Sequence, residues 1–176
     1  STTGLTWDQA IYGESFVNGT LGTTLNAFDF FIGLDKWEAM GDEIREDWAP
    51  ATSTTVQERF YSDFYFDEAN DYTLKLSNHV QKLDTLAVGT AGLYSYHNNR
   101  PFSTTDVDND ASGSACTASY GENPWWYGSC WDGNIGGYGG NEGAYWKGAS
   151  GSSTANGNGW IYLRGGVDSA HVDLTD

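Results

Sequence analysis

Apolar residues recur at helical spacing in two segments of the first fifty residues. Residues 6–16 carry a weak pattern of this kind, which predicts a short helix. Residues 34–48 carry a clearer one and predict an amphipathic helix that ends before Pro50, because the residue before a proline disfavours helical backbone. Between these segments, residues 28–33 form an apolar run that ends in Gly33 and has the length of a strand.

The hydrophobic period then changes from helical spacing to that of strands. Residues 55–66 are rich in β-branched and aromatic side chains, and residues 72–77 alternate between apolar and polar. These two runs predict a pair of adjacent strands joined by a short turn. Residues 80–93 can add a further strand and a glycine turn, and residues 159–164 predict a closing strand that returns to the sheet.

Regular periodicity ends near residue 94, where most of the glycines are found. A flexible linker is one interpretation of such a composition. Against it stand many large aromatic side chains, which favour burial. We therefore expect one domain, 1–176, with a helix and sheet part, 1–93, and a loop-rich part, 94–176, that ends in the closing strand.

The overall charge excludes several classes of function. The 176 residues include 24 acidic and 8 basic ones, for a formal net charge of −16. Nucleic acids and anionic membrane surfaces would repel such a chain. It holds no apolar stretch of about 18 residues, so no membrane insertion is expected. The sequon Asn18-Gly19-Thr20 agrees with a secreted glycoprotein, and Ser1 in place of Met agrees with a processed N-terminus.

Three aspartates alternate with other residues at Asp106, Asp108 and Asp110, a segment that we call the acidic strip. Carboxylates at such spacing can converge on a hard cation such as calcium. An EF-hand loop counted from the first aspartate would need glycine and glutamate where Ala111 and Thr117 stand, so that motif is excluded. A solvated acidic turn remains the simpler alternative.

Two cysteines, Cys116 and Cys130, enclose a short loop rich in glycine, tryptophan and tyrosine. A bridge between them would stabilise the fold by about 3 kcal/mol through loop closure. Two cysteines alone do not establish that bridge. A zinc site has little support, because no histidine or further cysteine lies nearby at ligand spacing.

Several short motifs in the loop-rich part have an order and spacing typical of one known family. They are Tyr96-His97-Asn98, Phe102-Ser103-Thr104, the acidic strip, Cys116, Trp125-Trp126-Tyr127 and Cys130. Together they resemble the fibrinogen-like C-terminal domain family, which includes ficolins and tachylectins. The resemblance implies an α+β fold with a twisted, mostly antiparallel sheet, short helices and a loop-rich subdomain for calcium and ligand.

The resemblance also implies site residues. It places calcium on the side chains of Asp108 and Asp110 and on the backbone carbonyls of Ser112 and Ser114, with Asp106 as a neighbour. It implies a disulfide between the two cysteines. Lectins of the family hold an acetylated ligand beside the calcium loop, and the ligand-binding candidates here are Tyr120, Trp131 and Tyr145.

The chain departs from the family pattern in three places. Trp131 stands where family lectins usually place a histidine. The stretch 138–146 is shorter than in those lectins. Family members usually begin with a small subdomain that has its own disulfide, and this chain starts inside that boundary, so we expect either a shortened branch of the family or a trimmed N-terminus.

We therefore expect a secreted, calcium-stabilised recognition domain that binds carbohydrate or another acetylated ligand. The alternative is a structural or adhesive subunit of an extracellular fibre or matrix, with self-association, and a peptide-binding module fits the same fold. None of His79, His97 and His171 has a recognisable nucleophile setting, so no enzyme is expected.

Overall fold

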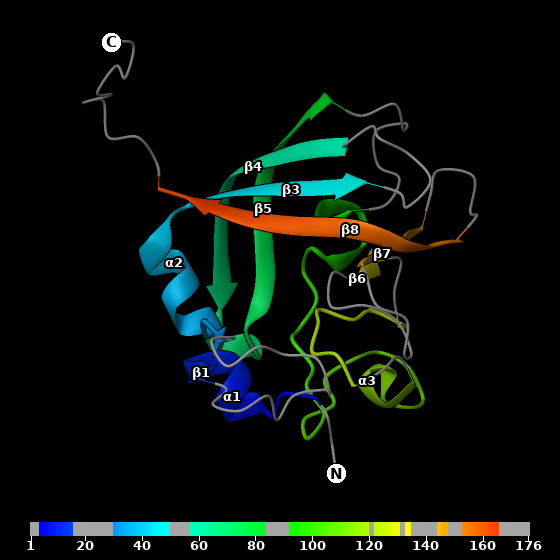
Figure 1. Cartoon of the computed structure of the whole chain (residues 1–176). Coiled ribbons are helices and arrows are strands. Elements are labelled where there is room, and N and C mark those ends of the chain that lie inside the picture. Colours follow the sequence, from blue (N-terminus) through cyan, green and yellow to red (C-terminus); the bar gives the residue numbers. More distant parts are fainter. Residues whose placement is uncertain are drawn as a thin grey trace.

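The computed structural model describes residues 4–15, 30–49, 57–83, 92–119, 122–130, 133–134, 144–147 and 153–165. Its centre is an antiparallel sheet, and α3 (Cys116–Ser119) with the loop before it lies on one side of this sheet (Figure 1). The strands follow the order β5 (Thr73–Leu83), β4 (Gln57–Asp67), β3 (Glu43–Ala49), β8 (Ser153–Arg164), β7 (Ala144–Lys147) and β6 (Gly133–Asn134).

The predicted strand pair is confirmed. β4 and β5 pair from Asp67 with Thr73 outward, and a 3-10 turn, η2 (Glu68–Asn70), joins them. Phe64 and Phe66 lie opposite Leu76 and Leu74, and all four side chains are buried. The alternation that the sequence shows in this segment is therefore the alternation between core and solvent.

The predicted closing strand is also confirmed, and it is longer than expected. β8 spans Ser153–Arg164 and pairs antiparallel with β3 along the whole length of β3. It lies between β3 and β7, so the last strand among the described residues is an interior strand of the sheet. Residues 80–83, the start of the range where a further strand was predicted, instead extend β5 to Leu83, and residues 84–91 lie outside the described residues.

The helix predicted over residues 34–48 is wrong in its second half. A 3-10 turn, η1 (Leu34–Lys36), and α2 (Trp37–Met40) are followed by β3. α2 ends at Gly41, where a side chain would collide with the backbone of Arg164 in β8. The sequence did not predict this strand, because a charged residue, Glu46, occupies one of its buried positions and interrupts the apolar pattern. Its side chain is 1% exposed.

Two short elements complete the part near the N-terminus. α1 (Trp7–Tyr12) confirms the short helix predicted there, and it buries Ala10 and Ile11. β1 (Glu14–Ser15) pairs antiparallel with β2 (Phe30–Phe31), which lies in the predicted apolar run. Across the described residues, no helix is long and apolar enough to cross a membrane.

Aromatic packing holds the loop-rich part against the sheet. The Trp126 ring stacks on Phe66 of β4 at a centroid distance of 5.5 Å and contacts Phe102 at 5.0 Å. Its indole N–H donates to the carbonyl of Tyr72, 2.9 Å away. Trp125 and Tyr127 are buried as well. For these residues, the flexible-linker interpretation is wrong, because burial of large rings stabilises a fixed arrangement.

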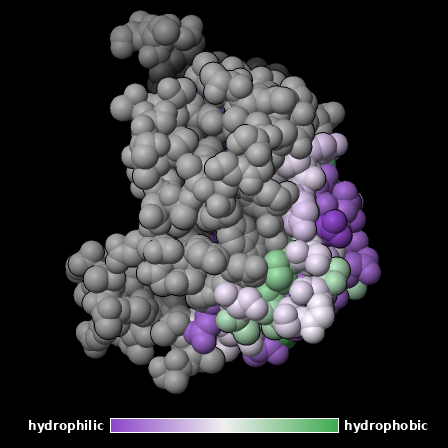
Figure 2. Space-filling model, turned by 90° about the vertical axis from the view of Figure 1, so that its right-hand side faces the viewer, coloured by the Kyte–Doolittle hydropathy of each residue, from purple (hydrophilic) through white to green (hydrophobic). Residues whose placement is uncertain are grey.

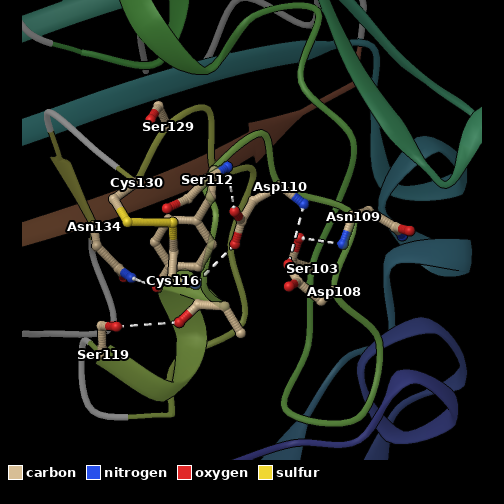
Figure 3. Close-up of a disulfide and its surroundings, with 12 residues drawn as sticks. Ser103, Asp108, Asn109, Asp110, Ser112, Cys116, Ser119, Ser129, Cys130 and Asn134 are labelled. Atoms are coloured by element: carbon tan, nitrogen blue, oxygen red, sulfur yellow. Dashed lines mark hydrogen bonds between the residues drawn. A yellow bond between two sulfur atoms is a disulfide. The ribbon is translucent and has the colours of Figure 1, made fainter.

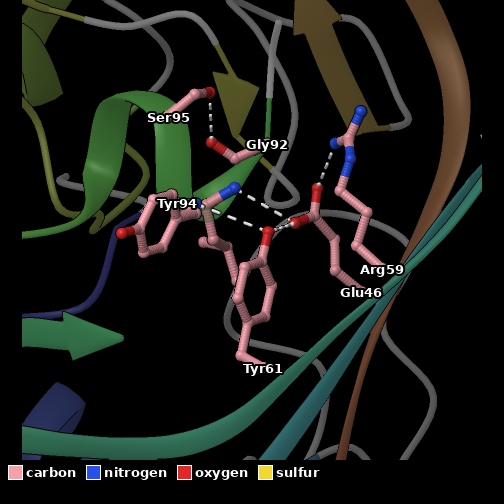
Figure 4. A network of polar contacts seen from close by, with 7 residues as sticks. Glu46, Arg59, Tyr61, Gly92, Tyr94 and Ser95 are labelled. Carbon is pink, nitrogen blue, oxygen red and sulfur yellow. Dashed lines mark hydrogen bonds and ion pairs between the residues drawn. The ribbon is translucent and has the colours of Figure 1, made fainter. Parts of the chain in front are cut away.

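A buried polar network joins the sheet to the first turn of the loop-rich part, η3 (Leu93–His97), as Figure 4 shows. The Glu46 carboxylate of β3 accepts hydrogen bonds from the Tyr61 hydroxyl at 2.7 Å and from the Leu93 backbone N–H at 3.0 Å. Its other oxygen lies 3.2 Å from Nη1 of Arg59. Desolvation raises the pKa of Tyr61 well above its ordinary value, and the Glu46 charge raises it further.

The loop segment that follows η3 pairs with β5, the first strand of the sheet. The backbone N–H of Leu74 donates to the carbonyl of Arg100, and that of Asn99 donates to the carbonyl of Leu74. The Asn98 side chain bonds both the N–H and the carbonyl of Leu76, at 2.8 and 3.1 Å. This pairing fixes the loop-rich part in register with the sheet.

Candidate functional site

The acidic strip begins where a short bridge orders the chain. Ser103 and Trp125 exchange backbone hydrogen bonds at 3.0 and 3.1 Å. The Ser103 hydroxyl also accepts a hydrogen bond from the Asn109 N–H at 3.1 Å, and the Asn109 side chain donates to the carbonyl of Phe102. These bonds fold the strip back on its own start, so it does not extend freely into solvent.

Asp110 organises the second half of this loop, as Figure 3 shows. Its Oδ1 accepts a hydrogen bond from the Ser112 N–H and its Oδ2 one from the Cys116 N–H, each at 2.8 Å. Both carboxylate oxygens therefore hold backbone in place. Each oxygen has a further lone pair, which leaves it able to contact a cation.

Asp108 lies beside Asp110 and is exposed. Its Oδ1 accepts a hydrogen bond from the Asp110 N–H at 3.3 Å. Desolvation raises the pKa of the Asp108 carboxyl, and its hydrogen-bonding neighbour Asp110 raises it further. A bound cation would favour the ionised form of Asp108, whose charge the nearby Asp110 opposes.

The donor set fits calcium. Asp108 and Asp110 supply carboxylate oxygens, and the backbone carbonyls of Ser112 and Ser114 lie in the same loop, which matches the preference of calcium for oxygen ligands. The described residues contain no group of three or more His, Cys, Asp or Glu side chains that could hold a metal. Calcium at this place would therefore depend on two carboxylates together with backbone and water oxygens.

Asp106, the first residue of the strip, has a different set of partners. Its Oδ1 accepts hydrogen bonds from the Trp7 backbone N–H at 2.8 Å and from the Thr104 hydroxyl at 2.7 Å. Leu5 contributes a carbonyl that accepts from the Thr105 hydroxyl at 3.0 Å. Asp106 thus attaches the start of α1 to the loop, and its expected place beside the metal ligands stays a prediction.

The expected disulfide is present. Cys116 begins the short helix α3 (Cys116–Ser119) and is joined to Cys130. Cys130 has a φ of 64°, an uncommon conformation for a residue with a side chain, and it pairs with Gly128. The Gly128 carbonyl accepts a hydrogen bond from the Ala111 N–H at 2.9 Å. The acidic strip and the disulfide loop therefore form one structure, residues 102–119 and 122–130, which we call the loop unit.

The three ligand-binding candidates are placed less completely. Tyr120 and Trp131 lie outside the described residues, as does the glycosylation candidate Asn18. The backbone of Tyr145 belongs to β7, where it pairs with Asn134 of β6. These residues stay predictions.

Two residues that the sequence analysis did not name as site candidates, Tyr96 and Arg100, lie against the loop unit. The Tyr96 hydroxyl donates to the carbonyl of Ser129 at 3.4 Å, and the Arg100 guanidinium lies 5.7 Å from the centre of the Tyr96 ring. One signal was available, because Arg100 is the only Lys or Arg between residues 92 and 130. On the face shown in Figure 2, hydrophilic residues of the described part lie beside small hydrophobic areas.

Comparison with known proteins places this geometry among related domains. The family model for the C-terminal globular domain of fibrinogen beta and gamma chains matches residues 12–172. Tenascin-R of Rattus norvegicus is 33% identical over 115 residues, which are 62% of this chain and 8% of that protein. The chain thus spans a small part of this relative.

Two solved structures share the fold. The fibrinogen-like globe domain of human ANGPTL6 has a TM-score of 0.64 at 20% identity, over 95% of this chain and 73% of that one. A lamprey fibrin D-dimer, complexed with the peptide ligand Gly-His-Arg-Pro-amide, has a TM-score of 0.63 at 20% identity, over 98% of this chain and 60% of that one.

Proposed function

This chain belongs to the family of fibrinogen C-terminal globular domains, and from that premise we propose that it is a secreted recognition domain whose loop unit binds a carbohydrate or another acetylated ligand. One observation carries the proposal: Asp110 joins the acidic strip to Cys116 of the disulfide loop through its two carboxylate oxygens. A group that orders the strip therefore also orders the loop that leads to the ligand candidates. The disulfide supports an oxidising, extracellular location.

Calcium is the group that we propose for the strip. Asp108 and Asp110 would hold it with their carboxylates, and Ser112 and Ser114 with their carbonyls. The ion would supply positive charge between two carboxylates that repel each other. The chain's own residues do the rest: Asp110 fixes the first cysteine, and the Ala111 N–H fixes the Gly128 carbonyl.

The ligand candidates are aromatic. Trp131 directly follows Cys130 of the disulfide in the sequence. Tyr120 follows α3, which begins at the other cysteine. Tyr145 lies on β7, one strand from the edge of the sheet. Large rings at these positions would offer stacking surface to a sugar, with backbone groups giving hydrogen bonds.

A glycan array tests the proposal with the full chain, once in calcium and once in EDTA. We expect glycan binding in calcium that weakens in EDTA. The control is Asp63→Asn, which removes the same charge as Asp108→Asn from an exposed position on β4. Binding should weaken in Asp108→Asn and persist in Asp63→Asn. An array without hits in calcium would contradict the carbohydrate proposal.

A peptide is the second ligand class to test, because the lamprey fibrin structure holds a basic peptide and this chain has a net charge of −16. Gly-His-Arg-Pro-amide serves as the probe in the same buffers. Binding of the peptide without any glycan would replace carbohydrate as the ligand class while leaving the site unchanged.

A structural or adhesive subunit remains the second candidate function. It is favoured by the comparison with tenascin-R, because the matched region is only 8% of that protein and is therefore one part of a much longer chain. Light scattering over a calcium series separates the two candidates. A strict monomer at all concentrations would count against self-association.

A further inference from the structure

Most cations in the described part of this acidic chain are paired with carboxylates. Ion pairs join Lys36 to Asp35, Arg45 to Asp47, Arg59 to Glu46 and Arg164 to Glu43. Lys75 donates to the Asn99 side chain at 3.0 Å. Arg100 differs, since among the described residues it makes no ion pair, although the chain has 24 acidic residues.

The Arg100 guanidinium is nevertheless held in a defined position. Its Nε donates to the Tyr96 carbonyl at 3.4 Å, and its Cζ lies 5.7 Å from the centre of the Tyr96 ring. A Cβ placed on Gly128 would lie 3.1 Å from Tyr96 Cε1 and 3.2 Å from Arg100 Nε. Both side chains therefore pack against the Gly128 backbone, and a side chain at that position would have to displace them slightly.

This arrangement leaves the outer donors of the guanidinium available. Nε is the only nitrogen of the Arg100 side chain with a hydrogen bond inside the described part of the chain. The remaining N–H groups form a planar fork that matches a carboxylate in two parallel hydrogen bonds. Stacking on an aromatic ring limits the rotamer entropy that is lost when a ligand binds.

The location connects this fork to the loop unit. The Tyr96 hydroxyl donates to the Ser129 carbonyl at 3.4 Å, and Ser129 precedes Cys130 and the ligand candidate Trp131. We infer that Arg100, held between Tyr96 and Gly128 beside the loop unit, binds the carboxylate of an acidic sugar. This inference rests on the proposed carbohydrate function and names the sugar class that the site prefers.

Methyl β-D-glucuronide and methyl β-D-glucoside test the inference, because they differ only in the carboxylate. Dissociation constants are measured by NMR titration of the full chain in calcium. We expect the glucuronide to bind about tenfold more tightly, the effect of hydrogen bonds to a charged partner. Arg100→Gln should reduce the ratio of the two constants to near one, and Arg100→Lys should give an intermediate ratio.

Arg164→Gln is the matched control, because it removes the same charge from an exposed residue on β8 and should keep the wild-type ratio. Thermal unfolding of each variant verifies that it is folded. An equal ratio in the wild type and in Arg100→Gln overturns the inference. If the wild type binds both sugars equally, the inference on Arg100 is wrong but the carbohydrate proposal stands. If the wild type binds neither sugar, both are wrong.

Discussion

Asp110 Oδ2 accepts a hydrogen bond from the backbone N–H of Cys116 at 2.8 Å, and this contact joins the acidic strip to the disulfide. The other oxygen of the same carboxylate holds the Ser112 N–H. One side chain thus satisfies two backbone donors within the loop that would hold calcium. Substitution of Asp110 should therefore lower the stability of the protein both with and without calcium.

Asp110→Asn should therefore destabilise the protein even in EDTA. An amide has only one acceptor oxygen, so it cannot accept from both Ser112 and Cys116, and one N–H loses its partner. We expect a loss of about 1–2 kcal/mol in the free energy of unfolding. Urea denaturation in EDTA measures it. Equal midpoints for the variant and the wild type would show that these two bonds contribute nothing.

Removal of calcium should lower the stability of the wild type, and this effect should depend on the proposed ligand Asp108. At a calcium concentration of 100 times the dissociation constant, binding stabilises the native state by about 2.7 kcal/mol. We expect EDTA to lower the melting temperature of the wild type and to have a much smaller effect on Asp108→Asn. Differential scanning calorimetry gives both values. A melting temperature that is the same in calcium and in EDTA would rule out the metal proposal.

Glu46→Gln should be among the more damaging single substitutions. It leaves the buried guanidinium of Arg59 without the carboxylate that lies 3.2 Å from it, which costs about 3 kcal/mol. Glu43→Gln is the matched control on the same strand. That residue pairs with Arg164, whose side chain is 60% exposed, so we expect a loss of at most about 1 kcal/mol. Denaturation of both variants compares the two pairs, and equal losses would contradict the ranking.

Tyr61 should make stability depend on alkaline pH. Because burial and the Glu46 charge raise the folded-state pKa of Tyr61 above its unfolded value, the folded state holds the proton more tightly. The contribution is fully present below the unfolded pKa, about 10, and is lost as the pH rises above it.

Tyr61→Phe should remove this part of the pH dependence. Above pH 10, the free energy of unfolding of the wild type should fall, relative to that of the variant, by about 1.4 kcal/mol for each pH unit. Urea denaturation between pH 8 and 11 measures the difference, and all other tyrosines are common to both proteins. Parallel pH profiles would mean that the folded pKa of Tyr61 is not raised.

The sequence predicted those elements of the fold and site that depend on residues close together in the chain. The strand pair of β4 and β5 follows from an alternation that packing preserves, as Phe64 and Leu76 show. The acidic strip and the cysteine loop were visible because their spacing is local. The family resemblance supplied the pairing of the cysteines, which two residues alone could not establish.

Features that depend on tertiary contacts were not predictable in this way. β3 was taken for the end of a helix because Leu34, Trp37, Met40 and Ile44 have helical spacing, while the buried Glu46 looks like a surface residue until Arg59 and Tyr61 surround it. The position of Arg100 likewise depends on Gly128, which lies far along the chain.

The pairing of β8 with β3 also has a consequence for synthesis of the protein. Glu43 lies opposite Arg164, so one edge of β3 has no partner until β8, far along the sequence, has left the ribosome. Contacts of such large sequence separation are formed slowly, and an unpaired strand can add to another chain in the meantime. Truncation before Ser153 would remove β8 and leave that edge of β3 open to pairing with another chain.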